Sequence, residues 1–317
     1  MQTFSTYLKR HGLKLWLANL LGTMATSTIT FLIGFILFSI AFMTGIFTLI
    51  SIDFSANDTP EQILSKFQTN AAASSLGIIV FFLSLLFLSI LSFLAGLFQV
   101  AAQYVVVDET IKIDRVSLVN YFVKGLKHTW RMFLLFIMSS LLSLPIFAII
   151  GFAIYLAITQ YSDITLLIIS IGLILLALLL FLLLGIALLY APYILVAENM
   201  GAMDSILLSI RIFLKKFWQV LLTCLLIWFV SIGYAVFGVL LYFPVFFSFF
   251  DPTGILATIL SMGITIIEFV YTFLGLPLIM AINSLIVGYR YHKHLRPHIL
   301  PDGGIGGNEQ EPLFTFK

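Results

Sequence analysis

The sequence has very little charge. Asp, Glu, Lys and Arg make up 9% of its 317 residues, whereas hydrophobic residues make up 61% and the mean hydropathy is +1.14. A soluble globular domain carries about 25% charged residues. A chain this apolar lacks the polar surface needed to face water on all sides, which argues against a soluble enzyme, a disordered protein and a nucleic-acid-binding domain. The composition indicates an integral membrane protein.

Cysteine and catalytic motifs are also scarce. The single cysteine, Cys224, excludes an internal disulfide and a cysteine-built metal site. The chain has no His-Glu-x-x-His motif, no Walker loop, no Gly-x-Ser-x-Gly motif and no paired aspartates within an apolar run. We therefore nominate no catalytic residue, no cofactor and no metal ligand. The net charge of +2 is too small to indicate a nucleic-acid partner.

Long apolar runs separate the few charged residues. Six runs of 31 to 41 residues occur, one of them interrupted only by Glu268. A hydrocarbon core of about 30 Å needs about 20 residues of helix, so each run holds one span but hardly two. The sequence predicts an all-α membrane protein with six transmembrane helices as three hairpins, one domain over 1–297 and a flexible cytoplasmic tail over 298–317. The predicted spans are approximately 17–50, 73–105, 132–160, 165–196, 218–249 and 255–288.

Basic residues are unevenly distributed around these spans. Fifteen of the sixteen lie in the N-terminal segment, the second and fourth connections and the C-terminal tail, and only Lys66 lies on the other side. Cytoplasmic segments carry an excess of Lys and Arg. Both termini are therefore predicted to be cytoplasmic, in a multi-pass protein of the plasma membrane.

A loose threefold repeat accompanies the hairpins. Trp16, Trp130 and Trp218 each follow a basic segment and precede an outgoing span. The similarity is one of pattern rather than identity, and hairpins that obey the same membrane rules would also look alike.

Two segments before these tryptophans have helical apolar spacing. They cover 116–130 and 206–217, and their other face carries polar and basic residues. Such amphipathic elbow helices lie in the membrane interface. They either bind lipid headgroups or simply hold the hairpins in register. The candidate headgroup contacts are Lys124, Lys127, Arg131, Arg211, Lys215 and Lys216.

Glu268 is the only ionisable residue deep within a predicted span. Exposure of a charge to lipid costs at least about 2.5 kcal/mol, so this side chain is expected to face the protein interior. Thr265 and Tyr271 lie near it at helical spacing. Glu268 is interpreted either as a proton or cation site or as a neutral carboxyl group hydrogen-bonded to another helix.

Further polar residues lie near the inner ends of the spans. Hydrogen bonds across helices are expected for the amides of Gln99, Gln103, Asn199 and Asn283. The cluster of His292, His294 and His298 is interpreted as a solvated basic flank rather than a metal site, because its neighbours are Lys and Arg.

One stretch resembles a known family. Ala-Pro-Tyr-Ile-Leu-Val-Ala-Glu-Asn at 191–199, followed by Gly201-Ala-Met-Asp-Ser-Ile and Ser209, resembles the membrane domain attached to some bacterial glycerophosphoryl diester phosphodiesterases, and its stand-alone relatives. The resemblance implies a bacterial plasma-membrane protein. The active site of those enzymes lies in a separate soluble domain, and only 21 residues follow Arg296 here, so the activity is not carried over.

The expected function is non-enzymatic. We expect an accessory or scaffold protein that acts through membrane lipids or other membrane proteins. The alternative is a small transporter or channel subunit that uses Glu268 as an intramembrane proton or cation site.

Overall fold

The chain is an all-α polytopic membrane protein. The structure, a computed structural model, describes residues 3–50, 59–61, 65, 71–159, 163–241 and 255–298, and these contain helices but no strand. Within them, six helical segments are long and apolar enough to cross a membrane, which confirms the prediction from the charge gaps. These segments are Phe4–Met43, Ile79–Ile113, Leu118–Thr159, Ile164–Ala197, Phe217–Leu241 and Met262–His298. The predicted tail lies, from residue 299, outside the described residues.

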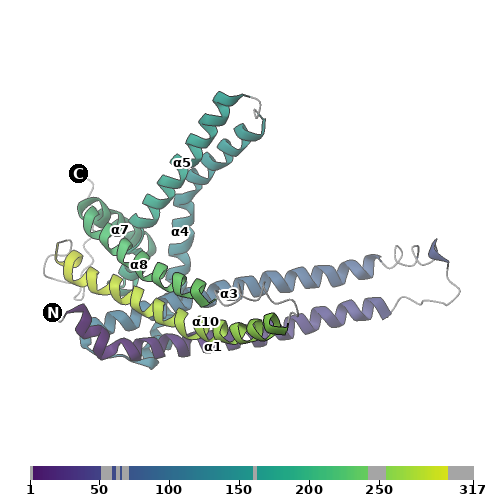
Figure 1. Ribbon diagram of the computed structural model, residues 1–317, viewed down its shortest axis with the longest axis horizontal. Helices are drawn as coiled ribbons and strands as arrows, with labels where there is room; N and C mark the ends of the chain where they lie inside the picture. The colour runs from purple at the N-terminus through teal and green to yellow at the C-terminus, as the bar shows by residue number, and fades with distance from the viewer. Residues whose placement is uncertain are drawn as a thin grey trace. The chain divides into compact units, whose positions relative to one another are not determined.

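Figure 1 shows the order of the helices along the chain. They are α1 (Phe4–Ile50), α3 (Ala71–Ile113), α4 (Leu118–Thr159), α5 (Ile164–Ala187), α6 (Ala191–Ala197), α7 (Ala202–Lys215), α8 (Phe217–Leu241) and α10 (Ile255–Arg290), then a π-helical turn η1 (Tyr291–Leu295) and a 3-10 turn η2 (Arg296–His298). The chain divides into two compact units. Unit 1 comprises Met1–Leu20 and Phe98–Lys317, and unit 2 comprises Leu21–Leu97.

Unit 2 contains the later part of α1 and the earlier part of α3. The two helices meet at Gly34, where an added Cβ would lie 3.1 Å from Leu88 Cδ1. Large apolar side chains are exposed along both helices, with Phe31 stacked on Phe35 and Phe38 on Phe42. Apolar side chains that remain exposed along a helix are stable in hydrocarbon but not in water.

Unit 1 contains the buried core, which is rich in tyrosine. Tyr121, Tyr190, Tyr193 and Tyr291 are its largest fully buried side chains. The short helix α6 runs through the middle of this core and buries six of its seven residues. Because a buried tyrosine hydroxyl needs a hydrogen-bond partner, such a core must also contain polar groups.

The fourth predicted span, 165–196, is interrupted. α5 ends at Ala187, the backbone turns over 188–190, and α6 starts with Pro192 in its first turn. Proline has no N–H to continue the preceding helical ladder, but it suits the first turn of a new helix. By contrast, Pro145 and Pro277 lie inside the continuous helices α4 and α10.

Only one of the two predicted elbows is a separate helix. α7 ends at Lys215 because Lys216 leaves the helical conformation, with φ −133° and ψ 42°, and α8 starts at Phe217. The elbow predicted at 116–130 is instead the first part of α4, which continues without a break into the span. That prediction of a separate element was wrong, because no glycine or proline lies between Lys127 and Arg131 to stop the helix.

Helices α4 and α5 form a hairpin within unit 1 (Figure 1). Asp163 caps the start of α5, because its carboxylate accepts hydrogen bonds from the backbone N–H groups of Thr165 and Leu166. Further along, Ser170 Oγ donates to the carbonyl oxygen of Ala153 at 2.6 Å. Ala153 and Ala177 are fully buried, and small residues of this kind let membrane helices approach closely.

Helices α8 and α10 are joined by a reciprocal tyrosine–glycine contact. The rings of Tyr234 and Tyr271 stack with centroids 4.4 Å apart, and each hydroxyl donates to the backbone carbonyl of the other residue. Tyr234 covers Gly275, where an added Cβ would lie 2.6 Å from the ring, and Tyr271 covers Gly238 at 3.1 Å. The two glycines therefore provide the space that the two rings need.

We predict that Gly275→Leu destabilises the protein, because the new side chain displaces Tyr234 and separates α8 from α10. Overpacking of this kind typically costs about 1–3 kcal/mol. The measurement is thermal unfolding in detergent, followed by reaction of the half-buried Cys224 thiol with a fluorogenic maleimide. Gly263→Leu on the same helix is the control, since nothing lies within 4 Å of a Cβ there. Equal unfolding midpoints for the two variants would contradict the tyrosine–glycine contact.

Candidate functional site

Charged and polar side chains gather at one end of unit 1, which we call the basic end. It is formed by the start of α1, the end of α3, the starts of α4 and α8, the helices α6 and α7, and the end of α10 with η1 and η2. Side-chain contacts join these segments although they lie far apart in the sequence, for example His292 with Asp108 and Arg296 with Glu198.

Asp108, near the end of α3, is the centre of the first polar cluster. Its Oδ1 lies 2.9 Å from His292 Nε2 and accepts a hydrogen bond from Tyr193 Oη at 3.2 Å. Its Oδ2 lies 2.9 Å from the ammonium group of Lys112, one helical turn further on. The same ammonium group donates to the carbonyl oxygen of Ala197 at the end of α6. One carboxylate thus connects α3, α6 and η1.

Glu198, directly after α6, is the centre of the second cluster. Its Oε1 accepts hydrogen bonds from Arg296 Nε at 2.8 Å and from Tyr291 Oη at 3.1 Å. The Glu198 side chain is only 8% exposed, so its charge requires a partner, and the Arg296 guanidinium supplies it. Tyr291 also packs edge-on against Tyr193, which joins the two clusters.

Two residues with a left-handed backbone complete this arrangement. Asp114 follows the end of α3 with φ 58°, and Asn199 follows α6 with φ 52°. Asp and Asn tolerate this conformation better than most residues and use it to end helices. Asp114 forms an ion pair with Arg10 and lies 2.6 Å from His11 Nε2. Asn199 Oδ1 accepts a hydrogen bond from Arg131 at 2.6 Å.

Two of the amides predicted to form hydrogen bonds across helices, Gln103 and Asn283, do so. Gln103 donates to the Met280 carbonyl and to Ser284 Oγ, and Asn283 donates to Ser231 Oγ. A further contact, which the sequence did not indicate, joins α8 to the end of α10. Arg290 Nε donates to Thr223 Oγ1 at 2.6 Å, and the same hydroxyl oxygen accepts from Tyr190.

These clusters hold helices together. Each buried carboxylate is neutralised by a Lys or Arg, and neither cluster contains a Ser or Cys positioned beside a base. Within the part of the chain that the structure describes, no group of three or more His, Cys, Asp or Glu side chains has a geometry that could hold a metal ion. His292 is buried against Asp108 instead of lying in a solvated flank.

The start of α4 presents its apolar residues outward. Tyr121, Gly125 and His128 are buried, and Gly125 packs so closely on Ala102 of α3 that an added Cβ would lie 2.5 Å away. The exposed face carries the α4 stripe, which consists of Val119, Val123, Leu126 and Trp130. All four side chains are 64–70% exposed.

Helix α7 repeats this arrangement. Ser205 and Ser209 are buried, and Ser209 Oγ donates to the Ala187 carbonyl at 2.6 Å. The outward face carries the α7 stripe, in which Ile210 is half-buried and the others are exposed. This stripe consists of Met203, Leu207, Ile210 and Leu214. Both stripes have the same spacing of four, three and four residues, which is one face of a helix.

The candidate headgroup cations differ in their contacts. Lys124 pairs with Glu109 of α3, and Arg131 binds Asn199. Lys127 and Lys215 are exposed beside the stripes, whereas Arg211 and Lys216 are half-buried. Some of the basic residues thus hold unit 1 together. The sequence does not show these pairs, because Glu and Asn residues such as Glu109 and Asn199 are also common at a surface without a partner.

Glu268 does not face the interior of this chain. It is exposed on α10, as is Thr265, and Tyr271 is engaged with Tyr234 rather than with Glu268. The expectation of an interior position was wrong. The contact between α8 and α10 reaches Gly238 and Tyr271, and Glu268 lies one helical turn beyond, where the described residues do not cover it.

Comparison of the chain with models of protein families, with curated proteins and with solved structures found no match. Assignment of a function therefore depends on the geometry of the basic end and of its two stripes.

We predict that Asp108→Asn destabilises the fold, because Lys112 and His292 lose their shared charged partner. Hydrogen bonds to charged groups contribute about 1.5–3 kcal/mol each, and the change weakens two of them. Thermal unfolding in detergent, read at Cys224, measures the effect. Asp204→Asn, at an exposed position in the first turn of α7, is the matched control. A midpoint for Asp108→Asn no lower than that of the control would show that the cluster does not hold these helices.

Proposed function

We propose that this protein is a non-enzymatic membrane protein whose basic end binds the anionic lipid surface of the cytoplasmic leaflet, as an accessory or scaffold protein. The two stripes carry this proposal. On α4 and on α7, apolar side chains point outward at the same spacing, and Lys127 and Lys215 lie exposed beside them. An apolar stripe flanked by Lys is the arrangement with which interfacial helices contact a membrane.

The orientation of the protein is part of the proposal. The start of α1, both returning helices α3 and α6, and the end of α10 meet at the basic end. The excess of Lys and Arg in cytoplasmic segments supports a cytoplasmic position for this end and for both termini. The resemblance of 191–209 to the membrane domain of bacterial glycerophosphoryl diester phosphodiesterases supports the bacterial plasma membrane as its location.

The charged residues of the two buried clusters have a structural role in this proposal. A protein that holds two amphipathic surfaces against the headgroups needs them fixed relative to its spans. Lys112, Glu198 and Arg296 contribute this rigidity by tying η1 and η2 to α3 and α6. Among the six candidate headgroup cations, Lys124 and Arg131 have partners within the protein, and Arg211 and Lys216 are half-buried. Lys127 and Lys215 are therefore the two best placed to meet lipid.

We expect that the double variant Lys127→Gln, Lys215→Gln lowers the preference of the protein for anionic lipid. Each cation near an anionic surface contributes about 1 kcal/mol, so the relative association constant should fall roughly fivefold per lysine. The measurement is the partition of spin-labelled phosphatidylglycerol against spin-labelled phosphatidylcholine at the surface of the reconstituted full-length protein.

Lys66→Gln is the control for this measurement, because the charge pattern places Lys66 on the opposite side of the membrane. It should leave the preference unchanged. A double variant with the same lipid preference as the unchanged protein would refute lipid binding by the stripes.

A second candidate function is that of a small transporter or channel subunit. The observation that favours it is the exposure of Glu268 on α10, within a segment that is apolar enough to cross the membrane. An ionisable side chain at such a position is costly in lipid, so a water-filled path or a second subunit would have to cover it.

Glu268→Gln tests this candidate, because it keeps the size of the side chain and removes the ionisable group. We expect proton- or cation-driven flux in proteoliposomes to be lost if Glu268 carries the ion. Gln at this position with unchanged flux would exclude the site, and Ile266→Val, at an exposed position of the same helix, is a control for general disturbance.

A further inference from the structure

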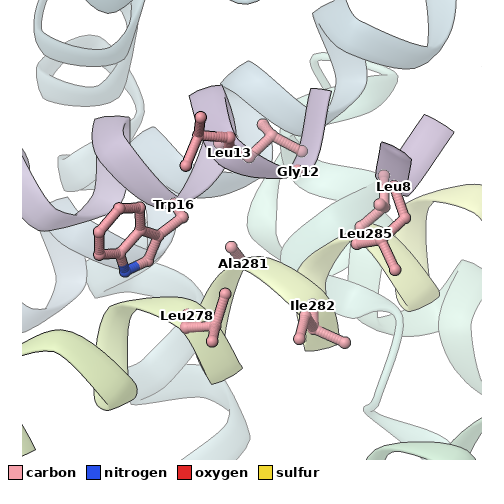
Figure 2. A pocket seen from close by; sticks show the side chains of 9 residues that line it. Leu8, Gly12, Leu13, Trp16, Leu278, Ala281, Ile282 and Leu285 are labelled. Carbon is pink, nitrogen blue, oxygen red and sulfur yellow. The ribbon is translucent and has the colours of Figure 1, made fainter. Parts of the chain in front are cut away.

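An apolar pocket lies between the first turns of α1 and the last turns of α10. Its volume is about 320 Å³, which is at the lower end of the range of about 300–1,000 Å³ found for ligand pockets. Figure 2 shows Leu8 and Leu285 at one end and Trp16 and Leu278 at the other, with Ala281 between them. All lining side chains are apolar apart from the indole N–H of Trp16, so the pocket is suited to a hydrocarbon chain rather than to a polar solute.

The size of the pocket depends on a small residue and on a fixed tryptophan. Gly12 lines the wall formed by α1, and an added Cβ would already lie 3.2 Å from Leu8 Cδ1. Trp16 Nε1 donates to the carbonyl oxygen of Leu274 at 2.9 Å, which fixes the ring across the two helices. Pro277 lies three residues after Leu274, and a proline within a helix loosens the backbone ladder around it.

Two cations flank the lining residues along the two helices. Lys9 is exposed, and it precedes Gly12 by three residues and Leu13 by four, so it shares their face of α1. On the other helix, Lys293 donates to Tyr289 Oη at 2.8 Å and lies over the Tyr289 ring. Tyr289 follows Leu285 by one turn.

Aromatic contacts join the two helices at this level. The ring of Tyr289 lies 5.7 Å from that of Phe4 and 6.2 Å from that of Tyr7. On α1 the apolar pocket therefore adjoins Lys9 directly, whereas on α10 Tyr289 lies between the pocket and Lys293. This order of an apolar pocket followed by positive charge matches a glycerophospholipid, which has a hydrocarbon chain next to a phosphate.

We propose that this pocket binds one acyl chain of an anionic phospholipid of the cytoplasmic leaflet, with its phosphate held between Lys9 and Lys293. Basic pockets between membrane helices on the cytoplasmic side are suited to such headgroups. The site is separate from the α4 and α7 stripes. It shares with the proposed function only the cytoplasmic position of the basic end.

The test uses the fluorescence of Trp16 in the full-length protein. The other tryptophans, Trp130, Trp218 and Trp228, are exposed and are replaced by Phe. The protein is reconstituted in nanodiscs with increasing fractions of phosphatidylglycerol or phosphatidylcholine that carry the same brominated acyl chains, which quench indole on contact. We expect phosphatidylglycerol to quench Trp16 at a several-fold lower mole fraction.

Variants separate the two halves of the site. Lys9→Gln and Lys293→Gln should each reduce the preference for phosphatidylglycerol about fivefold. Gly12→Leu fills the pocket and should reduce quenching by both lipids, whereas Gly172→Leu on α5, where nothing lies within 4 Å of a Cβ, should not. A second measurement, on the chain with all four tryptophans, is stabilisation of thermal unfolding by added phosphatidylglycerol. Gly12→Leu should reduce it, and the part that remains should be lost when Lys127→Gln and Lys215→Gln are added.

The proposal is overturned if the two lipids quench Trp16 equally, or if Gly12→Leu changes neither quenching nor stabilisation. Such a result would not contradict lipid binding by the stripes, because Lys127 and Lys215 are unchanged in the quenching measurements and in the single variant Gly12→Leu. Conversely, loss of lipid preference in the Lys127, Lys215 double variant with normal Trp16 quenching would assign lipid selectivity to the stripes and keep the pocket.

Discussion

Hydrocarbon cannot solvate a charge or an unpaired backbone group, and the rest of this structure depends on that constraint. The backbone solves it by forming long helices. Among the described residues, most charged side chains lie at one end of unit 1, where the buried carboxylates meet cations. Asp108 and Glu198 are the two centres of this arrangement. Because each is nearly buried, each is stable only with its partners in place, and so the end of α10 is held to α3 and α6.

The same constraint allows α4 and α7 to expose apolar side chains while α7 also buries polar ones. In a soluble protein, the apolar face of a helix packs inward and the polar face meets water. Here Ser205 and Ser209 are buried together with three apolar residues of α7, whereas Leu207 and Leu214 point outward. The polar groups find partners inside the protein, and the apolar stripes are left for the surroundings. These outward apolar side chains connect the packing of α4 and α7 with the proposed contact to a lipid surface.

The sequence was sufficient for the architecture because spans are set by a one-dimensional property, the distance between charges. It was not sufficient for the basic end, because the pairing of His292 with Asp108 joins residues 184 positions apart. Nor did the helical spacing of 116–130 reveal that this segment runs on into α4, since amphipathic spacing does not indicate where a helix ends. The prediction that Glu268 faces the interior failed for a related reason. The energetic cost of a charge in lipid indicates that the side chain is shielded, but not which helix or which chain shields it.

The central claim is that six spans place the basic end in the cytoplasm. The most direct measurement is labelling of single cysteines in intact cells with a membrane-impermeant maleimide, after Cys224→Ser. A cysteine introduced by Asp163→Cys, between α4 and α5, should react in intact cells, whereas one introduced by His298→Cys should react only after lysis. The reverse pattern, or equal reaction of both before lysis, would contradict the account.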